Sequence, residues 1–146
     1  MAGVVTTEQE QAASSTNGRP RVALTTRAAT GRSLDDRSDI AGTEAAEAAL
    51  AALGDAEPKL AVVFASADHE HADLLDSVRN VLPNVPIVGC SGEGIIVAND
   101  STEALSAAAV MLIASERIRF ETFLIENYAD DPSGAGARLA SLVNER

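Results

Sequence analysis

The chain has 146 residues, 46% of them hydrophobic, and its 22 acidic and 11 basic residues give a formal net charge of −11. This length and composition suit one globular domain, and the negative charge disfavours nucleic acid or an anionic membrane as a partner. The lone cysteine excludes an internal disulfide, and the sequence contains neither a signal peptide nor an apolar run long enough to span a membrane, so we expect a cytoplasmic protein.

The N-terminal third of the sequence predicts a tail, a strand, a loop and a helix. Residues 1–19 lack a periodic apolar pattern and predict a flexible tail, which leaves 20–146 as the domain. RVALTT, residues 21–26, predicts a first strand, and the polar sequence through Asp39 predicts a long loop. Residues 39–54 predict an alanine-rich helix that Asp39 or Thr43 caps and Gly54 ends.

The centre of the sequence predicts a strand, a helix and a second strand. LAVVFAS, residues 60–66, is a continuous apolar run typical of a strand covered on both faces, and PIVGC, residues 86–90, predicts another short buried strand. Between them, residues 74–82 carry apolar side chains at helical spacing. The three elements predict a βαβ unit with parallel strands, so Ser66 and His69 should lie beside Cys90 at the ligand-binding edge of the sheet.

The C-terminal part predicts strands and a last helix. Residues 104–114 are apolar, residues 117–126 alternate apolar and polar side chains, and together they predict a hairpin. Asp131 and Pro132 predict the start of a final helix with Leu139, Leu142 and Val143 facing inward. The expected fold class is therefore α/β: a mixed, mainly parallel sheet built on a βαβ unit, with packed helices and a C-terminal antiparallel hairpin.

Two catalytic interpretations can be weighed from the residues alone. A G-x-S-x-G nucleophile elbow fails because Glu93 stands where its second glycine is required. Cys90 could act as a nucleophile with His69 or His71 as its base, but the surrounding acidic residues disfavour a thiolate. A lone cysteine at the end of a buried strand is more often a small apolar side chain.

The glycine-rich turn and the histidines are weak signals for phosphate and for metal. Gly89, Gly92 and Gly94 reverse the order of the dinucleotide fingerprint, and Glu93 would repel a pyrophosphate. His69 and His71 are two residues apart and cannot share a helix face, so we predict no metal and no cofactor.

A polar pocket at the carboxyl edge of the sheet remains as the predicted site. Backbone N–H groups of the turn, together with hydroxyls and a carboxylate, could hold both ends of a zwitterion such as an amino acid. The predicted ligand-binding residues are Thr26, Ser66, His69, Cys90, Ser91, Gly92, Glu93 and Gly94.

The stretch LAVVFASADHEHADLLDSVRNVLPNVPIVGCSGEGII resembles the N-terminal domain of the FIST family, named for F-box and intracellular signal transduction proteins, and the resemblance extends over residues 21–146. It implies a sensory domain of a signal transduction protein that binds a small molecule, with amino acids proposed as ligands, and it supplies no catalytic residues. It also implies that the domain is truncated here and that a FIST C-terminal domain follows in a full-length protein. The alternatives are a cysteine-dependent enzyme using Cys90 and a protein-interaction scaffold.

Overall fold

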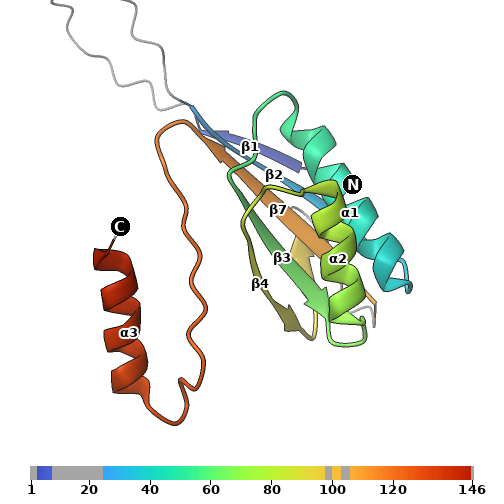
Figure 1. Cartoon of the computed structure of the whole chain (residues 1–146). Coiled ribbons are helices and arrows are strands. Elements are labelled where there is room, and N and C mark those ends of the chain that lie inside the picture. The colour runs from blue at the N-terminus through green and yellow to red at the C-terminus, as the bar shows by residue number, and fades with distance from the viewer. Residues whose placement is uncertain (1–2, 8–24, 98–99, 103–105, 146) are drawn as a thin grey trace, which may run out of the picture.

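The computed structural model describes residues 3–7, 25–97, 100–102 and 106–145. A five-stranded sheet with the strand order β1-β2-β7-β3-β4 forms its centre, and β5 and β6 form a separate two-stranded ribbon (Figure 1). The elements in chain order are β1 (Gly3–Thr7), β2 (Thr26–Ser33), α1 (Ser38–Leu53), β3 (Leu60–Ser66), α2 (His71–Val81), β4 (Ile87–Gly92), β5 (Ile95–Val97), β6 (Asp100–Thr102), β7 (Ala108–Ser115) and α3 (Pro132–Asn144).

The strand directions in the structure differ from those of the predicted, mainly parallel sheet. In the described sheet β3 and β4 are parallel neighbours, whereas β1 with β2, β2 with β7 and β3 with β7 are all antiparallel. The prediction of a mainly parallel sheet is therefore wrong. The reason is that β7 follows the β5–β6 ribbon instead of a helical crossover, and it enters the sheet between β2 and β3 in the opposite direction.

The predicted C-terminal hairpin is also wrong. Both edges of β7 are hydrogen-bonded, one to β2 and the other to β3, so no edge is left for residues 117–126. Those residues form no strand, despite their alternating pattern.

The first strand of the predicted domain extends beyond the residues that the sequence pattern predicts. Residues 26–33 form β2, although the sequence pattern predicts a loop from residue 27 onward, and residues 21–24 lie outside the described residues. The small side chains of β2 explain this strand, because Ala29 and Gly31 lie against α1, where a larger side chain at position 31 would meet the backbone of Ala45 and Ala49. Of the predicted tail, residues 3–7 form β1, and residues 8–19 are outside the described residues.

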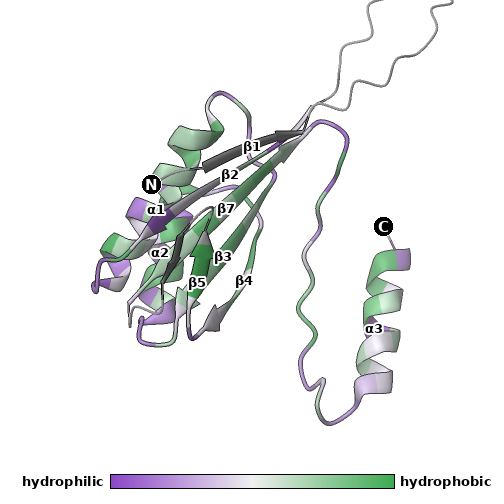
Figure 2. Cartoon of the chain, turned by 180° about the vertical axis from the view of Figure 1, so that it is seen from behind, coloured by the Kyte–Doolittle hydropathy of each residue, from purple (hydrophilic) through white to green (hydrophobic). Residues whose placement is uncertain are grey.

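Helices α1 and α2 cover one face of the sheet and leave much of the other open (Figures 1 and 2). Val63 and Ala65 of β3 face the helices and are buried, whereas Phe64 on the opposite face is 43% exposed. The prediction that β3 is covered on both faces is wrong for this reason. At one end of the open face, Ile95 of β5 packs with Ala107 and Ala109.

Both covering helices occupy the predicted segments, with a different start for α1. Arg37 precedes α1 as the N-cap and makes no side-chain cap, so the predicted caps Asp39 and Thr43 are wrong. The Arg37 guanidinium instead bonds Asp39 and lowers the pKa of that exposed carboxyl. Gly54 ends α1 with a φ of 75°, a conformation that glycine adopts without strain.

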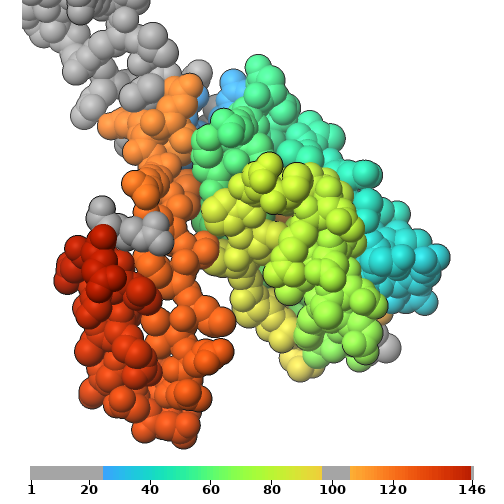
Figure 3. Space-filling model, viewed as in Figure 1, coloured from blue at the N-terminus to red at the C-terminus, as the bar shows by residue number. Residues whose placement is uncertain are grey.

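Residues 116–131 run in an extended path to α3, apart from the main body over most of their length (Figure 3). As predicted, Asp131 caps α3 by accepting a hydrogen bond from the Gly134 N–H at 2.9 Å, and Pro132 follows it. The predicted inward side chains are not inward, because Leu139, Leu142 and Val143 are all exposed.

Candidate functional site

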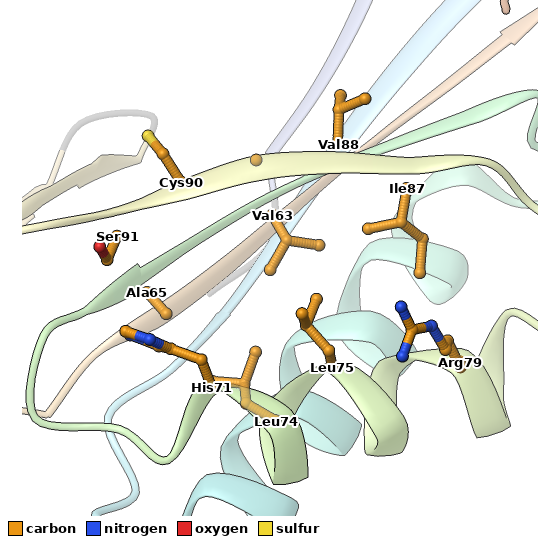
Figure 4. Close-up of a pocket in the computed structure, with 11 residues that line it drawn as sticks. Val63, Ala65, His71, Leu74, Leu75, Arg79, Ile87, Val88, Cys90 and Ser91 are labelled. Carbon is orange, nitrogen blue, oxygen red and sulfur yellow. The ribbon is translucent and has the colours of Figure 1, made fainter. Parts of the chain in front are cut away.

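A groove lies between α2 and the edge strand β4, on the helix-covered side of the sheet (Figure 4). Its volume is about 310 Å³, the size for a small metabolite. Its lining residues are Val63, Ala65, His71, Leu74, Leu75, Arg79, Ile87, Val88, Gly89, Cys90 and Ser91.

The helical wall of the groove is a stripe of three side chains on α2. His71, Leu75 and Arg79 are four residues apart, so they lie one above another on the same face of the helix. Leu74 and Val78 of the same helix are buried against the sheet. The stripe thus places an imidazole and a guanidinium at the two ends of an apolar wall (Figure 4).

The strand wall of the groove comes from alternate residues of β4. The side chains of Ile87 and Ser91 point toward α2, while those of Val88 and Cys90 point toward the open face (Figure 4). Gly89 lies between Ile87 and Ser91 on the α2 side and adds no side chain, which leaves the floor of the groove to Val63 of β3. A large residue at Ser91 would fill this space, whereas a side chain at Gly89 would collide with the backbone of Val63.

The groove also reflects the position of β4 in the sheet. α2 shares the buried core with β3, and β4 is the outermost strand on this side, so no described element covers the α2-facing surface of β4 from beyond the sheet edge. A shallow, partly apolar surface is therefore left beside the helix. The groove therefore depends on the position of β4 at the edge of the sheet as well as on the residues of β4.

Two other cavities are less suited to a small ligand. One lies at the opposite end of the sheet, where exposed ion pairs join Arg27 to Asp55 and Lys59 to Glu57. The other lies within the C-terminal segment, between residues 124–127 and α3. The first already pairs its own charges, and the second is formed by a segment with one buried helix residue, Ala135.

Two of the predicted ligand-binding residues, Cys90 and Ser91, line the groove. The strand register places Ser66 opposite Gly92, which is the neighbourhood that parallel strands predict. Gly92, Glu93 and Gly94 follow Ser91 along the chain, are exposed, and are not among the lining residues.

The other predicted residues are buried or distant. Ser66 is 2% exposed, and its Oγ accepts a hydrogen bond from the Ala107 N–H at 3.0 Å. The backbone of Ala107 thus covers the carboxyl end of β3. His69 is also buried, with Nδ1 3.3 Å from Ser38 Oγ. Thr26 lies at the opposite end of the sheet, where its hydroxyl is 2.8 Å from Ser115 Oγ, because β2 begins there instead of ending there.

The sequence pattern did not single out the α2 wall of the groove. Arg79 belongs to the polar side of the predicted helix, and His71 belongs to a polar helix start. The available signal was the four-residue spacing of His71, Leu75 and Arg79, which places two nitrogen-bearing side chains around a leucine on one face.

The site contains the groups for non-covalent binding of a small molecule. Its wall is mostly apolar, with one guanidinium, one imidazole and the Ser91 hydroxyl as polar groups. Across the described residues, no three His, Cys, Asp or Glu side chains are grouped so that they could hold a metal ion. No helix in the described parts of the chain has the length and apolar character needed to cross a membrane.

The fold and the groove define an α/β domain with a ligand-sized cleft beside its edge strand. Residues 59–145 match the family model described as the FIST N domain, which is more than half of the chain, and the chain therefore belongs to the FIST family. The match begins at β3 and covers fewer residues than the resemblance, which extends over residues 21–146. The family is linked to sensing in signal transduction. No curated protein and no solved structure gives a match.

Proposed function

We propose that this FIST domain is a sensory module that binds a small organic molecule in the groove between α2 and β4 and does not transform it. The observation that carries the proposal is the groove itself, with its apolar wall and a few polar groups at its ends. The proposal includes a cytoplasmic location and action together with a FIST C-terminal domain. It also includes an amino acid or similar metabolite as the ligand.

Binding is favoured over catalysis by the position of the only cysteine. Cys90 is exposed, and its side chain points to the open face of the sheet, whereas His71 extends from α2 on the other face (Figure 4). The imidazole Nε2 of His71 is 3.3 Å from the Ser66 carbonyl oxygen. A thiol and a base on opposite faces of a strand do not form a nucleophile–base pair.

The proposal is tested by titrating the ¹⁵N-labelled chain with amino acids, short organic acids, amines and amides. We expect the backbone resonances of Leu75 and Ser91 to shift in a saturable way with at least one compound class. Ser91→Phe should abolish the shifts, because it fills the groove from β4.

The matched control is Val62→Phe on the neighbouring strand β3, whose side chain alternates with that of Val63, points toward the open face and is not among the lining residues. This variant should bind as the unaltered chain does, and so should Glu93→Ala, whose side chain is outside the groove. Saturable shifts confined to residues outside the groove, or no shifts with any class, would overturn the proposal.

A further inference from the structure

The charged side chain that lines the groove is opposite in sign to the net charge of the whole chain. The chain has twice as many acidic as basic residues, yet the lining of the groove includes Arg79 and His71 and no aspartate or glutamate. An anion entering the groove would therefore meet a cation at one end and a hydrogen-bonding imidazole at the other. An ammonium group would meet no carboxylate among the lining residues.

The spacing of the polar groups sets the size of the ligand. His71 and Arg79 are eight residues apart on α2, which corresponds to about 12 Å along the helix axis. Leu75, Val63 and Ile87 occupy the space between them (Figure 4). A compound with a carboxylate at the Arg79 end and a short apolar body matches this arrangement.

Arg79 is available for such a ligand despite its ion pair. Its Nη1 is 3.0 Å from Oδ1 of Asp76, one turn earlier on α2, and both side chains are mostly exposed. Exposed pairs of this kind are weak and are easily exchanged for a better partner. The guanidinium extends from α2 toward Ile87, above the groove (Figure 4), so a carboxylate bound there could accept two parallel N–H bonds.

We propose that the ligand class of this groove is a small organic monocarboxylate with an apolar body and no ammonium group, held through its carboxylate by Arg79. The inference rests on the function proposed above and narrows it. It replaces the amino acid with the corresponding carboxylate that lacks the amino group, because the carboxylate of Glu93 that was expected to bind the ammonium is outside the groove.

Three compounds of nearly the same shape test the inference: 4-methylpentanoate, 4-methylpentanamide and leucine. Calorimetry and NMR titration should give a dissociation constant for the carboxylate at least about tenfold lower than for the amide or for leucine. Raising the salt concentration should weaken the binding of the carboxylate and leave that of the amide unchanged.

Variants separate the role of Arg79 from a structural one. Arg79→Gln should remove the preference for the carboxylate, while Asp76→Asn, which frees the guanidinium, should tighten carboxylate binding about threefold. Arg37→Gln is the matched control, since Arg37 is equally exposed and ion-paired, to Asp39 at 2.9 Å, but lies outside the groove. It should leave all three dissociation constants unchanged.

The outcomes distinguish the two proposals. If leucine or the amide binds in the groove as tightly as the carboxylate, or if Arg79→Gln weakens all three compounds equally, the ligand class is wrong and the binding function stands. If none of the three compounds, nor any class in the wider panel, shifts the groove resonances, both proposals are overturned.

Discussion

Gly89 illustrates how one residue can determine the shape of the site. A Cβ at this position would meet the backbone carbonyl of Val63 on the neighbouring strand β3, so only glycine allows this close approach of the strands. The glycine also leaves the strand wall of the groove without a side chain between Ile87 and Ser91. Its role is therefore close packing within the sheet, whereas the sequence pattern grouped it with Gly92 and Gly94 in a glycine-rich turn.

Replacing Gly89 with alanine should destabilise the fold, because the strands must move apart to relieve the contact with Val63. We expect a loss of about 2–3 kcal/mol in the free energy of unfolding, measured by urea titration. Gly92→Ala is the control on the same strand, since its Cβ would meet only the Gly94 carbonyl oxygen at 3.7 Å. That variant should change stability by less than about 0.5 kcal/mol, and equal losses in the two variants would contradict the explanation.

Ser66 shows how a predicted site residue can lie in the predicted neighbourhood and yet be covered by another part of the chain. Parallel pairing of β3 and β4 brings Ser66 next to Gly92, as the pattern indicates. The backbone of Ala107 then covers this point, with hydrogen bonds between its N–H and Ser66 Oγ and between its carbonyl and the Ser66 N–H. A covering segment 41 residues away along the chain leaves no local signal at Ser66 itself.

At the scale of elements, α1 depends on alanine for its contact with the sheet. Ala41, Ala45, Ala46 and Ala49 are completely buried, and the backbone of α1 lies directly over Gly31 of β2. Small side chains allow this short distance between helix and sheet, which a stripe of leucines would prevent. The alanine-rich sequence of this helix accounts for the close packing.

Ala45→Leu should therefore be strongly destabilising, since no space is left for the added atoms between α1 and β2. We expect a loss of about 3 kcal/mol in unfolding free energy. Ala51→Leu on the same helix is the matched control, because Ala51 is exposed, and it should remain within about 0.5 kcal/mol of the unaltered chain. A stable Ala45→Leu variant with unchanged urea midpoint would show that α1 does not lie as close as described.

At the scale of the whole molecule, the core and the C-terminal segment are separate. The buried residues of the main core fall between Ala29 and Ala114, and α3 contributes one buried residue, Ala135, outside that core. The extended residues 116–131 join the two parts without a strand of their own (Figure 3). The free energy of folding therefore comes almost entirely from the part that ends with β7.

A chain that stops after Glu116 should accordingly fold, with an unfolding free energy within about 1 kcal/mol of the full chain and a cooperative urea transition. A chain that stops after Ala107 is the control. It lacks β7, which hydrogen-bonds both β2 and β3, and it should not fold. Loss of cooperative unfolding in the longer truncation would show that residues 117–146 contribute to the core.

Local patterns in the sequence determined the elements that carry the site. The apolar run of β3, the helical spacing of α2, the short strand β4 and the alanine stripe of α1 are all encoded by neighbouring residues, and these elements formed where the sequence predicted. Membership of the FIST family follows from residues 59–145, which include β3, α2 and β4 but not α1. Spacing within a segment is enough for such predictions because helix and strand geometry repeat over a few residues.

Only the tertiary structure decided which elements are neighbours and which surfaces stay open. Insertion of β7 between β2 and β3 made the sheet mostly antiparallel, left residues 117–126 without a strand partner and buried Ser66. Because β4 lies at the edge of the sheet, the helix face that carries His71, Leu75 and Arg79 forms one wall of a groove. These results depend on contacts between residues far apart in the chain, and such contacts leave no periodic signal within any one segment.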